Sequence, residues 1–275
     1  MESVENTAMV EIRPATVADL PDIHRVWWAT ELDAQPSRVI KENPWFAHVL
    51  RTGSILIAIA GGGAVGFAGC RLVGDTKVIS DCFVHPERQG QGIGTALLQQ
   101  LLSKERPVMT LASGDPRARS LYARFGMVPL WECHYIEGAP RMLGSSALHI
   151  REIDSYPVPE ADLPHLQSDL CCTFLEVGRI ELGSTVAVTK RSVESSLVEP
   201  GADGALVLTS LMDWMASRGA AILELQLGER HPAFPVLIEA GFHVTGTDTL
   251  MASPGAGVPD QATLTFNGDL LLVGF

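Results

Sequence analysis

The strongest constraint on the fold is that the sequence contains the same pattern twice. Four segments of the N-terminal half are echoed, in the same order, in the C-terminal half of the 275 residues. The pairs are VADLPDI (17–23) and EADLPHL (160–166), GTALLQQLL (94–102) and GALVLTSLM (204–212), VMTLASGD (108–115) and ILELQLGE (222–229), and, with one residue inserted, SLYARFGMV (120–128) and VLIEAGFHV (236–244). Such ordered self-similarity indicates a duplicated structural unit. The sequence therefore predicts two copies of one α/β unit in tandem, over residues 1–143 and 144–275.

Each copy alternates strand-like and helix-like segments, most clearly in the N-terminal half. Thr16 and Asp19 form a capping box that predicts a helix running into RVWWAT, and Asp115-Pro116 predicts another helix start, with Gly126 as its stop. The other expected elements are strands at 9–13, 54–60, 64–73, 77–84, 108–112 and 127–136, and helices at 36–51, broken at Asn43-Pro44, and at 92–103. An Asn-Gly pair in ATLTFNGDLLLVGF predicts a hairpin at the C-terminal end. The fold class predicted is α/β, with a mixed sheet.

A glycine-rich segment after an apolar strand, GGGAVG at 61–66, formally satisfies the G-x-G-x-x-G dinucleotide pattern. That pattern requires a helix directly afterwards. The residues that follow, FAGCRLVG, have no helical spacing of apolar side chains. The segment is therefore predicted to be a tight hairpin between two strands, and not a nucleotide-binding loop.

A second glycine segment, PERQGQGIG at 86–94, lies between the strand-like VISDCFV and the helix-like TALLQQLL. Backbone N–H groups at a helix start have no partner within the helix and lie at the positive end of its dipole, so they attract anions. Glycines at Gly90, Gly92 and Gly94 leave no Cβ between these donors and phosphate oxygens. No G-K-[ST] follows, so the segment is not a P-loop. It predicts a phosphate-binding site of another kind.

The segment VHPERQGQGIGTALL resembles the acyl-CoA signature Q/R-x-x-G-x-G/A of the GCN5-related N-acetyltransferase (GNAT) superfamily. Gln89, Gly92 and Gly94 fill its fixed places, and Val84 and Pro86 match the V-x-P that precedes it. DPRARSLYARFGM is similar to a later helix of the superfamily, N-x-x-A-x-x-L-Y-x-x-x-G-F. The resemblance covers residues 9–137. It implies a mixed sheet splayed between its fourth and fifth strands, with acetyl-CoA as acyl donor in the gap.

The resemblance also implies which residues hold acetyl-CoA. The pyrophosphate is expected on the backbone amides of one loop, and the pantetheine arm along the end of the preceding strand. Asp115, where the superfamily has asparagine, and Ser120 are expected to contribute from the later helix. The residues so assigned are Phe83, Val84, Gln89, Gly90, Gln91, Gly92, Ile93, Gly94, Thr95, Asp115 and Ser120.

Acetyl transfer to an amine requires a neutral amine and a proton for the leaving thiolate, and an ordinary lysine-like amine has a pKa near 10.4. The resemblance implies that Tyr122, the tyrosine of the L-Y pair, donates this proton. A packing role for Tyr122 on the core face of its helix is the alternative. Asp81 is the candidate base, either directly or through water. Strand alternation, which puts Asp81 on one face with Phe83, leaves open whether it points away from the cofactor.

The resemblance implies that the first two helices and nearby loops form the acceptor side. They carry Trp27, Trp28, Trp45 and Phe46 among Glu31, Asp33 and Glu42. The aromatic rings either form an amine-binding wall or belong to the core, and core is favoured for at least two of them. The leading hypothesis is an acetyl-CoA-dependent N-acetyltransferase in which a primary amine of a small molecule attacks the thioester directly. The alternative is a non-catalytic acyl-CoA-binding module that acts through a protein partner.

The second copy has lost the features that carry this chemistry. Val198-Glu199-Pro200 is followed by only GAD before Gly204, so the loop is four residues shorter, and Leu237 falls at about the position of Tyr122. The second copy is therefore expected to have a structural role or to form a wall of the substrate cleft.

The amino-acid composition further limits the kinds of partner and ligand that are expected. A net charge of −12 argues against nonspecific nucleic-acid binding and is compatible with a cationic substrate. The five cysteines show no paired or metal-site spacing, so we expect no disulfide, no metal and a cytoplasmic location. MESVENTAMV lacks the features of a signal peptide. The uncharged segment 52–70 is interrupted by glycines and predicts strands, not a membrane span. Whether the chain is a monomer or a homodimer stays open.

Overall fold

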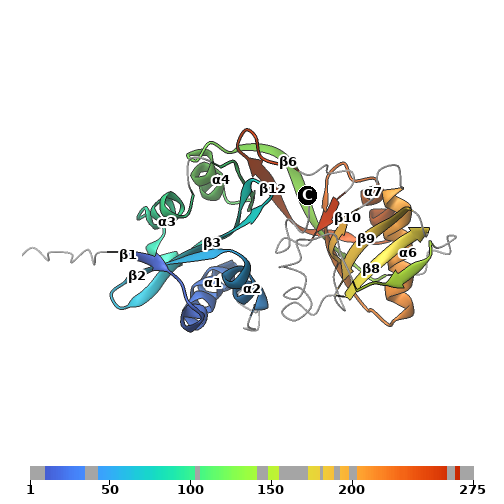
Figure 1. Ribbon diagram of the computed structural model, residues 1–275, viewed down its shortest axis with the longest axis horizontal. Coiled ribbons are helices and arrows are strands. Elements are labelled where there is room, and N and C mark those ends of the chain that lie inside the picture. The colour runs from blue at the N-terminus through green and yellow to red at the C-terminus, as the bar shows by residue number, and fades with distance from the viewer. Residues whose placement is uncertain are drawn as a thin grey trace, which may run out of the picture. The chain divides into compact units, whose positions relative to one another are not determined.

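The protein is described by a computed structural model, which covers residues 10–34, 43–102, 106–140, 148–154, 173–179, 182–188, 193–197, 203–258 and 264–266. Its contacts divide the chain into two compact units. The first comprises Met1–Leu72 and Lys77–Val108, and the second comprises Val73–Thr76 and Met109–Phe275. Each unit is a sheet with helices packed on it (Figure 1).

The first unit has a four-stranded sheet in the order β1-β2-β3-β4. Its strands are β1 (Glu11–Pro14), β2 (Ser54–Ala60), β3 (Gly63–Val73) and β4 (Thr76–Val84), and its helices are α1 (Leu20–Ala34), α2 (Pro44–Thr52) and α3 (Ile93–Leu101). The predicted hairpin at GGGAVG is confirmed, since β2 and β3 pair antiparallel across it, and Gly61 and Gly62 have φ of 60° and 81°. The Asn43-Pro44 break is the start of α2, whose first turn Asn43 caps by accepting from the N–H of Trp45.

Neighbouring residues of β3 face opposite sides of this sheet and position the helices. The ring of Phe67 packs on Phe46 of α2, with ring centroids 5.2 Å apart. Gly66 faces the other side, where a Cβ would lie 3.2 Å from Ile93 Cγ2 and 3.4 Å from Leu97 Cδ1 of α3. The missing side chain therefore lets α3 pack closely on one face of the sheet, while α1 and α2 cover the other (Figure 1).

The second unit has its strands in the order β5-β12-β6-β11-β13-β10-β9-β8-β7. They are β5 (Val108–Ala112), β6 (Val128–Gly138), β7 (Ile150–Glu152), β8 (Thr173–Arg179), β9 (Leu182–Val188), β10 (Val193–Leu197), β11 (Leu223–Gly228), β12 (His243–Ala252) and β13 (Leu264–Phe266). The helices are α4 (Pro116–Ala123), α6 (Gly204–Ser217) and α7 (Ala233–Glu239). Buried leucines of α6, α7 and β11 form its main hydrophobic core, with Leu211, Leu225 and Leu237 among them.

The two sequence repeats interlock in this sheet through their sixth strands, β6 and β12. β12 pairs antiparallel with both β5 and β6, so it separates the fifth and sixth strands of the first repeat. In the same way, β6 pairs antiparallel with both β11 and β12. It therefore separates the fifth and sixth strands of the second repeat. Each repeat thus completes the sheet of the other. This exchange explains why the compact second unit starts near residue 109, before the predicted repeat boundary at 143.

Candidate active site

The glycine segment forms the connection between β4 and α3. After Val84, a short 3-10 turn at Pro86–Arg88 leads to Gly90 and Gly92, which have φ of 76° and 81°. A hydrogen bond links the end of β4 to this turn: the side-chain amide of Gln89 donates to the carbonyl of Val84 at 3.1 Å. A Cβ at Gly90 or Gly92 would meet nothing within 4 Å. Glycine is therefore required here by the left-handed backbone and not by crowding within the chain.

Gly92 is the N-cap of α3, and no side chain caps this helix. Its carbonyl accepts from the N–H of Ala96, so the N–H groups of Ile93, Gly94 and Thr95 precede the first intrahelical bond. Gly90, Gln91 and Gly92 are exposed, which opens the helix start to solvent. These uncapped amides lie at the positive end of the helix dipole, which is a favourable environment for an anionic group.

Asp81 of β4 is a buried carboxyl, with 7% of the residue exposed. It lies on the face of α2, beside Trp45 and Ser80. Burial raises its pKa to about 6, and the nearby Ser80 hydroxyl and Trp45 indole N–H offset only part of that rise. Neither contact reaches hydrogen-bond geometry, so Asp81 Oδ2 has no hydrogen-bond partner among the described residues. A carboxyl with this pKa changes protonation just below neutral pH, in the range where general acid–base groups work well.

The space for this carboxyl is left by Gly69 of β3, which pattern reasoning did not single out. A Cβ at position 69 would lie 2.8 Å from Ser80 Oγ and 3.2 Å from Asp81 Oδ2. Val49 of α2 closes the same space, since its Cγ1 would lie 3.3 Å from that Cβ. The signal in the sequence was a glycine inside a continuous apolar strand, which marks a close approach of another group.

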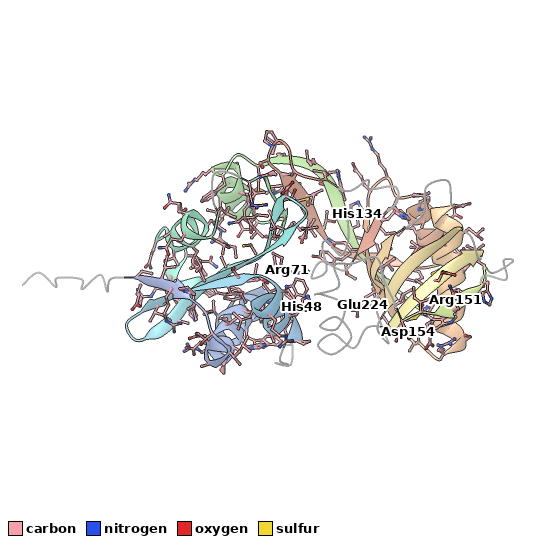
Figure 2. All side chains as sticks on the ribbon, viewed as in Figure 1. His48, Arg71, His134, Arg151, Asp154 and Glu224 are labelled. Carbon is pink, nitrogen blue, oxygen red and sulfur yellow. The ribbon has the colours of Figure 1, made fainter. Side chains whose placement is uncertain are left out.

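Trp45 connects this carboxyl to two further buried side chains, His48 and Arg71, which Figure 2 labels. The imidazole of His48 stacks on the Trp45 ring with centroids 5.2 Å apart. The guanidinium carbon of Arg71 lies 5.9 Å from the centroid of the same ring. The α2 face of the sheet therefore combines a carboxyl, an indole, an imidazole and a guanidinium. Arg71, a charged residue inside the apolar strand GAVGFAGCRLV, was missed by sequence reasoning.

Phe83 lies on the same face, with its ring centroid 5.5 Å from that of Phe67. The aromatic residues of the first two helices are mainly core: Trp28, Trp45 and Phe46 are all buried, whereas Trp27 is half-buried and contacts both Trp28 and Phe46. This agrees with the expectation that at least two of them are core. The side chains of Glu31 and Asp33, and the whole of Glu42, lie outside the described residues.

The remaining predicted residues belong to the second unit, on and before α4. Asp115 caps α4 by accepting from the N–H of Arg117 at 2.8 Å, and the Arg117 guanidinium lowers its carboxyl pKa. The Ser120 hydroxyl donates to the carbonyl of Pro116 at 2.7 Å. Tyr122 is 6% exposed and lies one turn before Gly126, which ends the helix with φ of 80°. The first unit thus brings together Asp81, the strand end and the glycine loop, and the second holds Asp115, Ser120 and Tyr122.

The second repeat ends its equivalent helix in the same way. Gly241 has φ of 95°, and the N–H of Phe242 donates to the carbonyl of Leu237, as that of Met127 donates to the carbonyl of Tyr122. Leu237 therefore occupies the position equivalent to Tyr122, and it is a fully buried core side chain.

Neither a metal site nor a membrane span is found in the part of the chain that the structure describes. No three His, Cys, Asp or Glu side chains there are grouped to hold a metal ion. No helix there is long and apolar enough to span a membrane.

Comparison of the sequence with known proteins points to acetyl transfer. Residues 51–128 match the acetyltransferase (GNAT) domain family. Over 144 residues the chain is 35% identical to a mycothiol acetyltransferase from Sanguibacter keddieii. This alignment covers 46% of the chain, and the chain spans only 42% of the length of that relative.

Comparison of the structure extends the likeness to nearly the whole chain. A putative acetyltransferase from Pyrococcus horikoshii matches with a TM-score of 0.76 and 16% identity, over 94% of this chain and 95% of that one. A tandem GNAT protein from the clavulanic acid biosynthesis pathway matches with a TM-score of 0.59 and 16% identity, over 91% and 100%. At these identities the likeness shows the fold alone. It confirms the predicted α/β fold of two GNAT-like units in tandem.

Proposed function

We propose that this chain is an N-acetyltransferase of the GNAT superfamily, whose acetyltransferase domain residues 51–128 match, and that it transfers the acetyl group of acetyl-CoA to a primary amine of a small molecule. The observation that carries the proposal is the uncapped start of α3 at Gly92, at the end of the connection that follows the strand that holds Asp81. A phosphate-binding helix start and a buried carboxyl on adjoining segments supply the two ends of such a site. Both lie within the stretch that matches the GNAT domain family.

In the proposed complex, the amides of Gln89–Thr95 bind the pyrophosphate of acetyl-CoA. Gly90 and Gly92 give the loop its left-handed turns, and the N–H groups of Ile93, Gly94 and Thr95 precede the first intrahelical bond of α3. The pantetheine arm follows the end of β4 at Phe83 and Val84. Asp115 and Ser120, which already hold local hydrogen bonds at α4, are proposed to contribute their outer surfaces to the same cofactor.

The proposed reaction is direct attack of the amine nitrogen on the thioester carbonyl. The carbon–sulfur bond breaks, an amide forms, and the thiolate leaves with a proton from the Tyr122 hydroxyl. The proton lost by the amine goes to Asp81, directly or through water, because a carboxyl with a pKa of about 6 is ionised at neutral pH and still accepts a proton. The products are the amide and the free CoA thiol, and the enzyme is left with a protonated Asp81 and a Tyr122 phenolate. Passage of a proton from Asp81 to Tyr122 through solvent restores both groups.

The test is the release of free CoA thiol from acetyl-CoA in the presence of amino acids, amino sugars and polyamines. We expect one class of amine to stimulate release, with an acetylated product seen by mass spectrometry. Binding of acetyl-CoA without turnover on any amine would instead support the alternative of a non-catalytic acyl-CoA-binding module. Absence of acetyl-CoA binding would exclude both.

A further inference from the structure

We infer that the second repeat is permanently closed to acyl-CoA, because the chain itself fills both parts of the corresponding site: strand β13 takes the place of the extended arm, and the Asp203 carboxylate takes that of the pyrophosphate. The inference rests on the proposed cofactor site of the first repeat, with which the second is compared.

The strand β13 lies between β10 and β11 and pairs with both. Thr265 is in register with Ser196 of β10 on one side and with Leu227 of β11 on the other. Both pairings are antiparallel, so β10 and β11 run parallel to each other with β13 inserted between them. In the second repeat these two strands, joined through α6, correspond to β4 and β5 joined through α3 in the first.

This insertion removes the strand edges that a ligand would need. An extended ligand arm binds beside a strand by using the N–H and C=O groups of a free edge. The edge of β10 that faces β11 is paired with β13, and its other edge is paired with β9. The edges of β11 are likewise taken by β13 and β6. An acyl-CoA arm can enter only if β13 leaves.

The helix start is filled as well. Asp203 is the N-cap of α6, and its Oδ1 accepts from the N–H of Ala205 at 2.9 Å and of Leu206 at 3.1 Å. The equivalent second and third positions of α3 are Gly94 and Thr95, which lack a side-chain cap. A carboxylate already provides the negative charge at the second helix start. A phosphate placed there would meet an anion instead of bare amides.

The shorter loop of the second repeat therefore has a structural consequence at the start of α6. In the first repeat the chain enters α3 through two glycines with positive φ, of which Gly92 is the N-cap, whereas in the second it enters α6 through Asp203. Leu237 also stands in place of Tyr122. We call the second repeat self-liganded, because β13 and the Asp203 carboxylate of the chain itself occupy the places of the ligand, and we assign it a role in supporting the sheet. The protein is accordingly expected to bind one acyl-CoA per chain.

The first experiment measures the stoichiometry of CoA binding to the full chain by calorimetry. We expect one site for the wild type and none for Gly92→Glu, which puts a carboxylate at the first helix start. Gly61→Glu is the matched control, because Gly61 also has positive φ and open space but lies in the β2–β3 hairpin. It is expected to keep one site. Two sites in the wild type, or a site in Gly92→Glu that slows exchange at Ala205 and Leu206, would overturn the inference while the proposed function stands. A site in folded Gly92→Glu without that slowing would instead contradict the proposed placement of the pyrophosphate at the start of α3.

The second experiment needs no variant. Hydrogen exchange with and without CoA is expected to show slower exchange over residues 85–96, and no change over 193–197 and 203–210. CoA-dependent slowing at Ala205 and Leu206 would overturn the inference. If the wild type binds no CoA at all, the proposed function fails and the inference falls with it.

Discussion

The carboxyl of Asp81 occupies the space that a side chain on Gly69 would need. A Cβ at position 69 would lie 3.2 Å from Asp81 Oδ2 and 2.8 Å from Ser80 Oγ, so the glycine of β3 and the carboxyl of β4 require each other. The carboxyl of Asp81 can therefore be buried here because position 69 of the neighbouring strand has no side chain.

Gly69→Ala is expected to displace Asp81 and Ser80 and to lower kcat at least tenfold. Crowding of this kind in a packed site costs about 1–3 kcal/mol of stability. Steady-state kinetics and thermal unfolding measure the two effects. Gly63→Ala is the matched control in the same strand, because its Cβ would approach only Arg25 Nη2, at 4.0 Å. An active Gly69→Ala enzyme with an unchanged pH profile would contradict the positioning of Asp81 described here.

The pH dependence of catalysis is expected to follow the ionisation of Asp81. As a base, Asp81 acts only when deprotonated, and burial raises its pKa to about 6. Activity should therefore rise with pH through about 6 and level off above it. The measurement is kcat/KM from pH 5 to 8 with an amine concentration corrected for its own protonation. In Asp81→Asn the inflection should vanish, along with roughly 100-fold or more of the activity.

The same raised pKa predicts that Asp81 weakens the folded state at neutral pH. The folded carboxyl has a pKa of about 6, above its ordinary value of 3.8, so the folded state binds its proton more tightly than the unfolded chain does. Stability is therefore lost as pH rises from 3.8 to 6, by up to about 3 kcal/mol. Asp81→Asn, which removes the charge, should unfold at a higher temperature than the wild type at pH 8 and exceed it by a smaller margin at pH 4.5, where only part of the loss has occurred. A less stable variant at pH 8 would show that the carboxylate is well solvated or paired.

Local patterns in the sequence were enough to predict most elements of the first repeat. The strand at 108–112, the hairpin at 61–66 and the caps at Asn43 and Asp115 all depend on residues close together in the chain, which fix local backbone geometry. The exchange of β6 and β12 and the insertion of β13 were not predictable in this way. They depend on which strand edges meet, and edge pairing is a property of the assembled sheet.

The same distinction between local patterns and contacts of the assembled fold applies to the candidate site. The glycine loop could be predicted from the sequence, because its positive-φ glycines and the helix start after them involve consecutive residues. The environment of Asp81 does not, since Gly69, Trp45 and Arg71 come from separate elements and meet only in the folded unit. Strand alternation put Asp81 and Phe83 on one face, and the structure places both on the face of α2, but only packing decides how deeply the carboxyl is buried.

Tyr122→Phe is expected to lower kcat about 100-fold or more while leaving the KM for acetyl-CoA within a few fold, because only the proton for the thiolate is lost. Folding should be preserved, as the ring stays in its buried position. Tyr122→Leu is a second variant suggested by the chain itself, since Leu237 fills the equivalent position of the second repeat. Both variants should bind CoA with wild-type stoichiometry. An unchanged kcat in Tyr122→Phe would remove the hydroxyl from the mechanism and leave Tyr122 as a core residue.

Asp203→Ala is expected to destabilise α6 without affecting catalysis. The substitution removes a carboxylate that accepts from two N–H groups at the helix start, and loss of such a cap costs about 1 kcal/mol. Faster hydrogen exchange in the first turn of α6 and a lower urea midpoint measure this loss, and Asp203→Asn, which keeps the acceptor oxygen, should restore most of it. Because the second repeat is self-liganded, kcat and the affinity for acetyl-CoA should match those of the wild type. A second CoA site in Asp203→Ala would mean that the carboxylate alone, without β13, keeps the second repeat closed.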